Sequence, residues 1–194
     1  MNLQEFLQST GRTMERAKVE HLAGEPITIE AVDPWQPVGP PLDSEFQRIL
    51  AYPPGAREIT LQGKVQPVTP NLMVLISAVS PEADPGEFVD LVVDTSAQLE
   101  GWTTDEDLAG ESDYGQDGKE VPVVYRYLAG KYKAEVGETK TSSMLAGWNA
   151  GGKTYVFQAV ATTFEGSDEF HDSALESVRV GPWTLPQLID AMRG

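Results

Sequence analysis

The amino-acid sequence predicts an α+β fold in which a mainly antiparallel β-sheet has helices packed on its faces. Two observations lead to this prediction. Residues 121–164 are rich in β-branched and aromatic side chains and have no helical period, which is typical of several consecutive strands. Apolar residues at three- and four-residue steps indicate amphipathic helices near the N-terminus, over 84–100 and near the C-terminus.

The strand expected over 153–164 is apolar on both faces, which predicts an interior position with a layer packed on each side. The glycine-containing turn at 149–152 pairs it with a strand over 139–148. A third strand is expected over 121–134. The alternative, that 121–164 forms the wall of a ligand-lined barrel, stays open.

Composition excludes several classes of protein. The 194 residues fit one domain, with or without an arm, and the absence of cysteine excludes disulfides, thiolate zinc sites and cysteine nucleophiles. The formal net charge is −16, and lysine and arginine cluster only at Lys131 and Lys133, so we expect no nucleic-acid partner. No apolar run approaches the ~20 residues of a transmembrane helix. The acidity favours basic partners or simply solubility.

The N-terminal segment has apolar residues at helical spacing from residue 2 to residue 22, followed by a breaker at 24–26. We therefore expect an N-terminal amphipathic helix, residues 1–24, and a single α+β domain, residues 25–194. The helix either packs on the domain or docks a partner protein. The candidate partner-binding residues on it are Leu3, Phe6, Leu7 and Met14.

Trp35 is a further candidate for partner binding. It lies in a segment with four prolines between residues 33 and 41, which predicts an extended, polyproline-like loop. Such a loop can present a tryptophan to an aromatic groove on another protein. The alternative is that Trp35 plugs the edge of the core.

The remaining elements follow from local signals. Short strands are expected over 27–32, 46–52, 58–65 and 71–79. The helix over 84–100 has Asp84 as its cap, Pro85 at its first position and Glu87 in its first turn. A second helix is expected over 167–178, then a brief return to the sheet at 180–183 and a last helix capped by Thr184.

Residues 103–120 carry seven carboxylates against Lys119 alone and are rich in glycine, which predicts a solvated surface loop or a poorly paired hairpin. The calcium-loop pattern fails in two registers of this segment. A non-standard cation site formed by Asp113, Asp117 and Glu120 remains as a weak alternative.

No catalytic or cofactor-binding constellation is evident, so we expect neither a catalytic residue nor a cofactor. Histidine occurs only at positions 21 and 171, which disfavours a zinc site. His171, Asp172 and Ser173 are neighbours along a helix and point in different directions, so they cannot form a relay. No phosphate-binding glycine motif occurs.

The order of several features resembles the LpqN/LpqT-type proteins of actinobacteria. The matching features, spread over about residues 26–182, are Pro70-Asn71-Leu72, Pro81, Asp84-Pro85, the long helix, Gly101-Trp102, Gly130-x-Tyr132, Tyr155-Val156-Phe157 and the closing helix. The resemblance implies a PsbP-like α/β/α sandwich and a role in binding other proteins or small ligands, with no catalytic residues. The chain departs from that family in lacking a lipobox cysteine and an export signal and in its additional N-terminal helix, so we expect a cytoplasmic relative.

The sequence thus predicts a non-enzymatic accessory module that binds another protein, of unidentified nature. One alternative is a small-ligand-binding protein with a pocket between sheet and helix. A hydrolase without a recognisable signature is the other, because 30 acidic residues supply carboxylate pairs that no sequence feature distinguishes.

Overall fold

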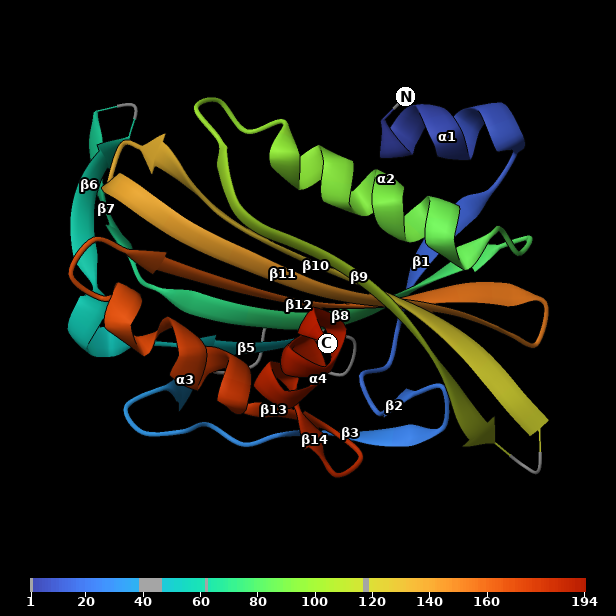
Figure 1. Ribbon diagram of the computed structural model, residues 1–194. Helices are drawn as coiled ribbons and strands as arrows, with labels where there is room; N and C mark the ends of the chain where they lie inside the picture. The colour runs from blue at the N-terminus through green and yellow to red at the C-terminus, as the bar shows by residue number, and fades with distance from the viewer. Residues whose placement is uncertain (1, 39–46, 62, 117–118) are drawn as a thin grey trace.

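The computed structural model describes residues 2–38, 47–61, 63–116 and 119–194. Within these ranges an antiparallel sheet of eight strands forms the centre of the molecule (Figure 1). Its order is β4-β5-β8-β12-β11-β10-β9, and β1 and β5 share one side of β8. The strands are β1 (Thr13–Ala17), β4 (Gln36–Pro37), β5 (Gln47–Ala51), β8 (Asn71–Ser80), β9 (Thr103–Gln116), β10 (Lys119–Ala134), β11 (Gly137–Ala150) and β12 (Lys153–Phe164).

Smaller elements surround this sheet. A second sheet has the order β14-β13-β3-β2, and β6 and β7 form a separate hairpin. The strands are β2 (His21–Leu22), β3 (Glu25–Ile29), β6 (Arg57–Leu61), β7 (Lys64–Val68), β13 (Val178–Val180) and β14 (Trp183–Thr184). The helices are α1 (Leu3–Thr10), α2 (Pro85–Ala97), α3 (His171–Glu176) and α4 (Leu185–Arg193), with 3-10 turns η1 (Pro53–Gly55) and η2 (Asp168–Phe170). None of the helices in the described ranges is long and apolar enough to cross a membrane.

The main sheet separates two hydrophobic cores. On β11, Leu145 faces the core formed with α1 and α2, whereas Met144 and Ala146 face the core formed with α3, α4 and the second sheet. Figure 1 shows α1 and α2 on one side of the sheet and α3, α4 and the second sheet on the other. The prediction of an α+β fold, a mainly antiparallel sheet with helices on its faces, is confirmed, as are two apolar faces on the central strand β12.

Helix α2 begins where the sequence predicted. The carboxylate of Asp84 accepts a hydrogen bond from the backbone N–H of Glu87 at 2.8 Å, which satisfies one of the unpaired donors of the first turn. The helix then passes so close to β11 that a Cβ atom at Gly147 would lie 2.8 Å from Cγ2 of Val89 and 3.0 Å from the carbonyl oxygen of Pro85. Glycine at position 147 therefore sets how closely α2 packs on the sheet.

The N-terminal segment differs from the prediction. Helix α1 ends at Gly11, which has a φ of 65° and donates its N–H back to the last turn, so the chain leaves the helix in a left-handed cap. Residues Thr13–Ala17 then pair with β8, with Thr13 opposite Ser80. The predicted helix through residue 22 is wrong, and so is the separation of residues 1–24 from the domain, because β1 is a strand of the main sheet.

Three further expectations are corrected. The single strand expected over 58–65 is the hairpin β6–β7, which reverses direction at Gly63 with a φ of 76°. Residues 103–116 are not a loop or a poorly paired hairpin but a long strand in continuous antiparallel register with β10, apart from one shift at Ala129/Gly130. The helix expected over 167–178 is shorter and is preceded by η2.

Candidate groove between β9 and α4

A groove of about 410 Å³ lies between β9, at the edge of the main sheet, and α4 on the face of that sheet. It combines aromatic, aliphatic and acidic side chains from four elements. They are Gly110, Glu111, Ser112, Asp113 and Tyr114 of β9, Tyr125 of β10, Trp183 of β14, and Gln187, Leu188, Ala191 and Met192 of α4. We consider it the strongest candidate site among the described parts of the chain, because it has an apolar lining and a few converging polar groups.

Strand β9 supplies one wall of the groove and also the end of the sheet. It pairs with β10 on one side, and no strand in the described ranges pairs with its other side. Side chains alternate along it: Leu108 and Tyr114 are half-buried toward α4, whereas Asp107 and Asp113 are exposed. The outer backbone edge of β9 therefore runs beside the groove.

Helix α4 supplies the opposite wall. A capping box between Thr184 and Gln187 starts the helix, and Leu185 and Ile189 anchor it in the core. Arg193 in the last turn donates two hydrogen bonds to the carboxylate of Glu106, at 2.8 and 2.7 Å. These bonds hold the pKa of Glu106 below its ordinary value and fix the end of the helix over β9.

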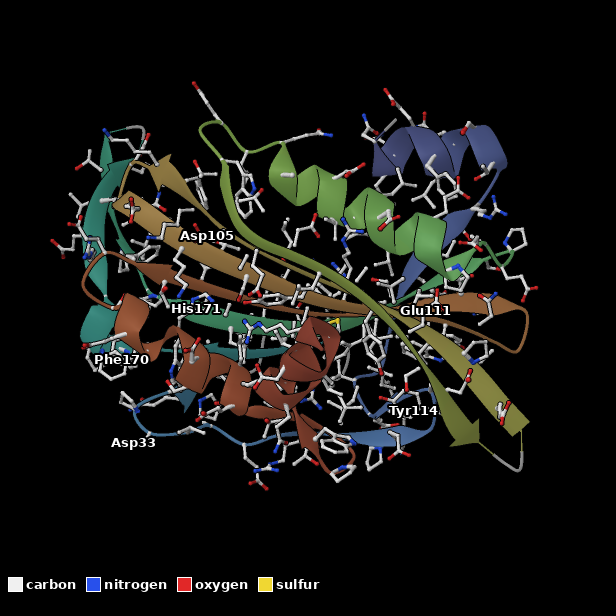
Figure 2. The ribbon with its side chains drawn as sticks, viewed as in Figure 1. Asp33, Asp105, Glu111, Tyr114, Phe170 and His171 are labelled. Atoms are coloured by element: carbon white, nitrogen blue, oxygen red, sulfur yellow. The ribbon has the colours of Figure 1, made fainter. Side chains whose placement is uncertain are left out.

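Two tyrosines meet at the floor of the groove. The hydroxyls of Tyr125 and Tyr114 share a hydrogen bond, with Tyr125 donating. Burial, the hydrogen bond to Tyr114 and the nearby carboxylate of Glu25 all raise the pKa of Tyr125, so its phenol stays neutral. Figure 2 shows Tyr114 on the part of β9 that extends past α4 toward the end of the β9–β10 hairpin.

Two acidic residues of β9 border the groove. Glu111 and Asp113 are exposed, and because they pair with Val124 and Pro122 of β10 their side chains lie on the face of the sheet that carries α2; no lysine or arginine is among the residues that line the groove. The arginines nearest to β9 already bind carboxylates: Arg126 contacts Asp107 at 2.7 Å and Asp90 at 3.3 Å. Of the described lining residues, only acidic ones carry a formal charge.

Phe6, predicted to bind a partner, lies in the interior of the protein. It is 2% exposed and its ring meets that of Phe88 on α2 edge-on, with centroids 6.1 Å apart. Leu3 and Leu7 are half-buried against the same cluster. Met14 is on β1 rather than on a helix and is 40% exposed. The apolar stripe of α1 thus packs on its own domain, which corrects the role expected for Phe6.

Trp35 is also an interior residue. It is 3% exposed, its ring lies 5.6 Å from that of Tyr52, and its indole N–H donates a hydrogen bond to the hydroxyl of Ser173 on α3 at 2.9 Å. The segment Gln36–Pro37 after it forms β4. The core-plug alternative describes Trp35, and the partner-binding role expected for it is wrong in this structure.

The weak cation site finds no support in the described residues. Asp113 lies on β9, Glu120 lies on β10 opposite Gly115, and Asp117 falls outside the described residues. Within those residues no group of three or more histidine, cysteine, aspartate or glutamate side chains is arranged to hold a metal ion.

His171 belongs to a buried polar cluster rather than to an open cleft. Its Nε2 lies 2.6 Å from the hydroxyl of Ser142 on β11, and its Nδ1 lies 3.0 Å from the hydroxyl of Thr163 on β12. Ser142 and Thr163 are fully buried and His171 is 1% exposed. Figure 2 shows His171 against the sheet, where it ties α3 to β11 and β12.

His171→Leu is expected to lower the free energy of unfolding by about 2 kcal/mol, because two buried hydroxyls lose their imidazole partner. Urea unfolding followed by circular dichroism measures the change. The control is His21→Leu at the exposed histidine, which should stay within about 0.5 kcal/mol of the unsubstituted protein. Equal stability of the two variants would contradict a structural role for the His171 cluster.

The groove itself was not predicted from the sequence. Its residues come from positions between 110 and 192 that meet only when β9 pairs with β10 and α4 packs across it. The one available signal was the two-residue spacing, typical of a strand, on which Leu108, Gly110 and Tyr114 all fall. The many carboxylates around them gave the segment the composition of a loop instead. Trp183 of β14, which also lines the groove, is 51% exposed.

Comparison with known proteins gives a fold but no curated relative. No protein-family model matches the chain, and neither does any curated protein. The chain is similar to the crystal structure of LpqN from Mycobacterium tuberculosis, with a TM-score of 0.64 and 11% identity over 94% of this chain and 98% of LpqN. PA94 from Pseudomonas aeruginosa, a protein of unknown function, matches with a TM-score of 0.29 and 14% identity over 62% of this chain and 90% of PA94. The chain therefore has an LpqN-like fold.

Proposed function

We propose that the chain is a non-enzymatic accessory module that binds an extended segment of another protein along β9. The observation that carries this proposal is the outer edge of β9, a strand of 14 residues whose second side no strand in the described ranges pairs with. Such an edge offers a row of backbone N–H and C=O groups that an added strand satisfies. The groove beside it gives a place for a side chain of the added segment.

The other surfaces predicted for partner binding are weaker candidates. Phe6 and Trp35 are buried inside the protein, and α1 packs on α2. The fold adds general support, because LpqN is described as involved in cell envelope biogenesis and an accessory role is compatible with that description.

Small-ligand binding is the second candidate function, and the groove is also the observation that favours it. Its volume of about 410 Å³ lies within the ~300–1,000 Å³ of small-molecule pockets. We rank this function second because Trp183 at the groove is 51% exposed and the groove adjoins an open strand edge, features that suit a longer partner.

Selection from a displayed library of random nonapeptides tests the proposal. Peptides enriched on the purified protein are expected to slow amide hydrogen exchange in β9, because an added strand protects its outer N–H groups. N-methylation of such a peptide at alternate residues should weaken binding about tenfold or more, whereas methylation of the intervening residues should leave it nearly unchanged. This alternation follows from the two-residue repeat of a strand.

A pair of matched variants locates the site. Ala191→Trp fills the groove from α4 and is expected to weaken the selected peptides about tenfold, whereas Ala97→Trp, an equal change at an exposed position of α2, should not affect them. Absence of any enriched peptide, or exchange protection away from β9, would contradict the proposal.

A further inference from the structure

Strand β9 lies between two grooves of different chemistry. Figure 1 shows it crossing the molecule with α2 on one side and α4 on the other. The groove described above lies on the α4 side. A second groove, of about 320 Å³, lies on the α2 side and is lined by Gly86, Val89 and Asp90 of α2, Ala109, Gly110 and Glu111 of β9, and Val124, Tyr125 and Arg126 of β10. A strand added at the outer edge of β9 therefore has one groove beside each of its faces.

The α4 side of β9 suits a large apolar side chain. Gly110 and Ser112 stand in the middle of the row of side chains on this side, and neither is large, so the groove beside them is not filled from β9. Aliphatic side chains of α4 form the opposite wall, and the ring of Trp183 at the groove is 51% exposed. An aliphatic or aromatic side chain of the added strand would cover these apolar surfaces and remove them from water.

The α2 side of β9 is acidic. Asp107, Glu111 and Asp113 are exposed along it, and α2 adds Asp90. The positive charge of Arg126 is shared between two carboxylates, since it contacts Asp107 at 2.7 Å and Asp90 at 3.3 Å. Glu111 and Asp113 form no ion pair within the described part of the chain. Because opposite charges on adjacent strands attract, this row favours lysine or arginine on the α2 face of an added strand.

The same acidic row disfavours a second copy of this chain at β9. Directly opposite residues of two antiparallel strands point to the same face of a sheet. Two copies of β9 paired in this way would therefore place their acidic rows side by side, and like charges on adjacent strands repel. The formal charge of −16 adds to this repulsion and attracts basic partners instead.

We propose that the segment bound along β9 has two different faces. An aliphatic or aromatic side chain points toward α4 and fills the groove there, and the residues immediately before and after it are lysine or arginine and point toward α2. The alternation follows from the two-residue repeat of a strand, which sends neighbouring side chains to opposite faces. This inference rests on the proposed function, because it assumes strand addition at β9.

The nonapeptide selection described above also tests this inference. The enriched pool is expected to contain a large apolar residue with lysine or arginine on both sides of it. The matched control is a peptide of the same composition in which both basic residues are moved to the positions two away from the apolar residue, so that all three side chains fall on one face. It should bind about tenfold more weakly. A shift of its register moves the three side chains together and cannot restore the match.

Two substitutions in the selected peptide separate its faces. Alanine in place of the apolar residue should weaken binding about tenfold, because the groove on the α4 side is left unfilled. Norleucine in place of both basic residues keeps most of their stems and removes their charges. It should weaken binding about fivefold and make the affinity nearly independent of salt concentration.

Charge variants of the protein locate the basic residues of the peptide. Glu111→Gln combined with Asp113→Asn is expected to weaken the selected peptide about fivefold and to leave the norleucine peptide within about twofold. The control is Glu30→Gln with Asp33→Asn, an equal charge change at two exposed positions. Figure 2 shows Asp33 and Tyr114 at opposite ends of the molecule.

The possible results separate the two proposals. Peptides that protect β9 from exchange but bind equally well with all three side chains on one face would overturn the two-faced segment and leave strand addition standing. Equal losses in the double variant of β9 and in its control would also overturn it, since the preference would then reflect net charge alone. No enriched peptide, or protection away from β9, would remove both proposals.

Discussion

Phe6→Ala is expected to lower the free energy of unfolding by about 3–5 kcal/mol. The ring of Phe6 is 2% exposed and meets Phe88, which is itself 1% exposed, so the substitution removes a large buried surface and leaves a cavity between α1 and α2. The methyl side chain of alanine cannot refill that space. Urea unfolding followed by far-UV circular dichroism and by tryptophan fluorescence gives the free energy.

The control for Phe6→Ala is Met14→Ala, which changes another apolar residue of the N-terminal segment. Met14 is 40% exposed on β1, and its truncation should change stability by no more than about 0.5 kcal/mol. If Phe6→Ala also proved neutral, α1 would not pack on α2 as the structure shows, and the docking-arm interpretation of the N-terminal stripe would be restored.

Gly147→Val is expected to destabilise the protein by about 3 kcal/mol. A Cβ atom at this position would approach Val89 to 2.8 Å and the carbonyl oxygen of Pro85 to 3.0 Å, and valine adds two more methyl groups. The backbone of α2 must then move away from β11, which weakens the packing of Phe88 and Val89 on the sheet. Thermal and urea unfolding both report the loss.

Ala109→Val provides the control for the glycine substitution. Ala109 is an exposed residue of β9, so valine there adds bulk at the protein surface and should leave stability within about 0.5 kcal/mol. A small effect at Gly147 would mean that α2 lies farther from the sheet than described. A large effect at Ala109 would mean that β9 tolerates no added side-chain volume.

Local sequence signals were enough to predict those backbone features that a single residue type determines, such as the start of a helix. Asp84 and Thr184 both cap helices as predicted. The side-chain oxygen of each accepts a hydrogen bond from an unpaired backbone N–H in the first turn of the helix that follows. The strands β8, β11 and β12 also lie where the sequence placed them, since their β-branched and aromatic residues suit a sheet buried on both faces.

Prediction from the sequence failed where the composition of a segment indicates a loop but its pairing with a neighbouring strand makes it part of the sheet. Asp105, Asp107 and Asp113 gave residues 103–120 the composition of a solvated loop, yet the same segment is held as β9 by its long register with β10. The apolar stripe of α1 indicated that Phe6 would be buried, but it did not indicate which residues would bury it. An apolar face predicts burial, and whether its own domain or a partner covers it depends on contacts far apart in the sequence.

The groove was beyond prediction for a related reason. Tyr114 and Tyr125 meet because the β9–β10 register places them on one face, and Trp183 joins them through β14 of another sheet. No spacing along the chain encodes that meeting.

The pairing of β1 with β8 has a consequence for how the chain assembles during synthesis. Thr13 bonds to Ser80 across 67 positions, so β1 leaves the ribosome long before its partner strand exists. Closing so long a loop carries an entropic cost before any contact forms, which makes this pairing a late event. The first strand to be made is thus among the last to join the main sheet, and until it does, the half of β8 that bears Val79 has an open edge.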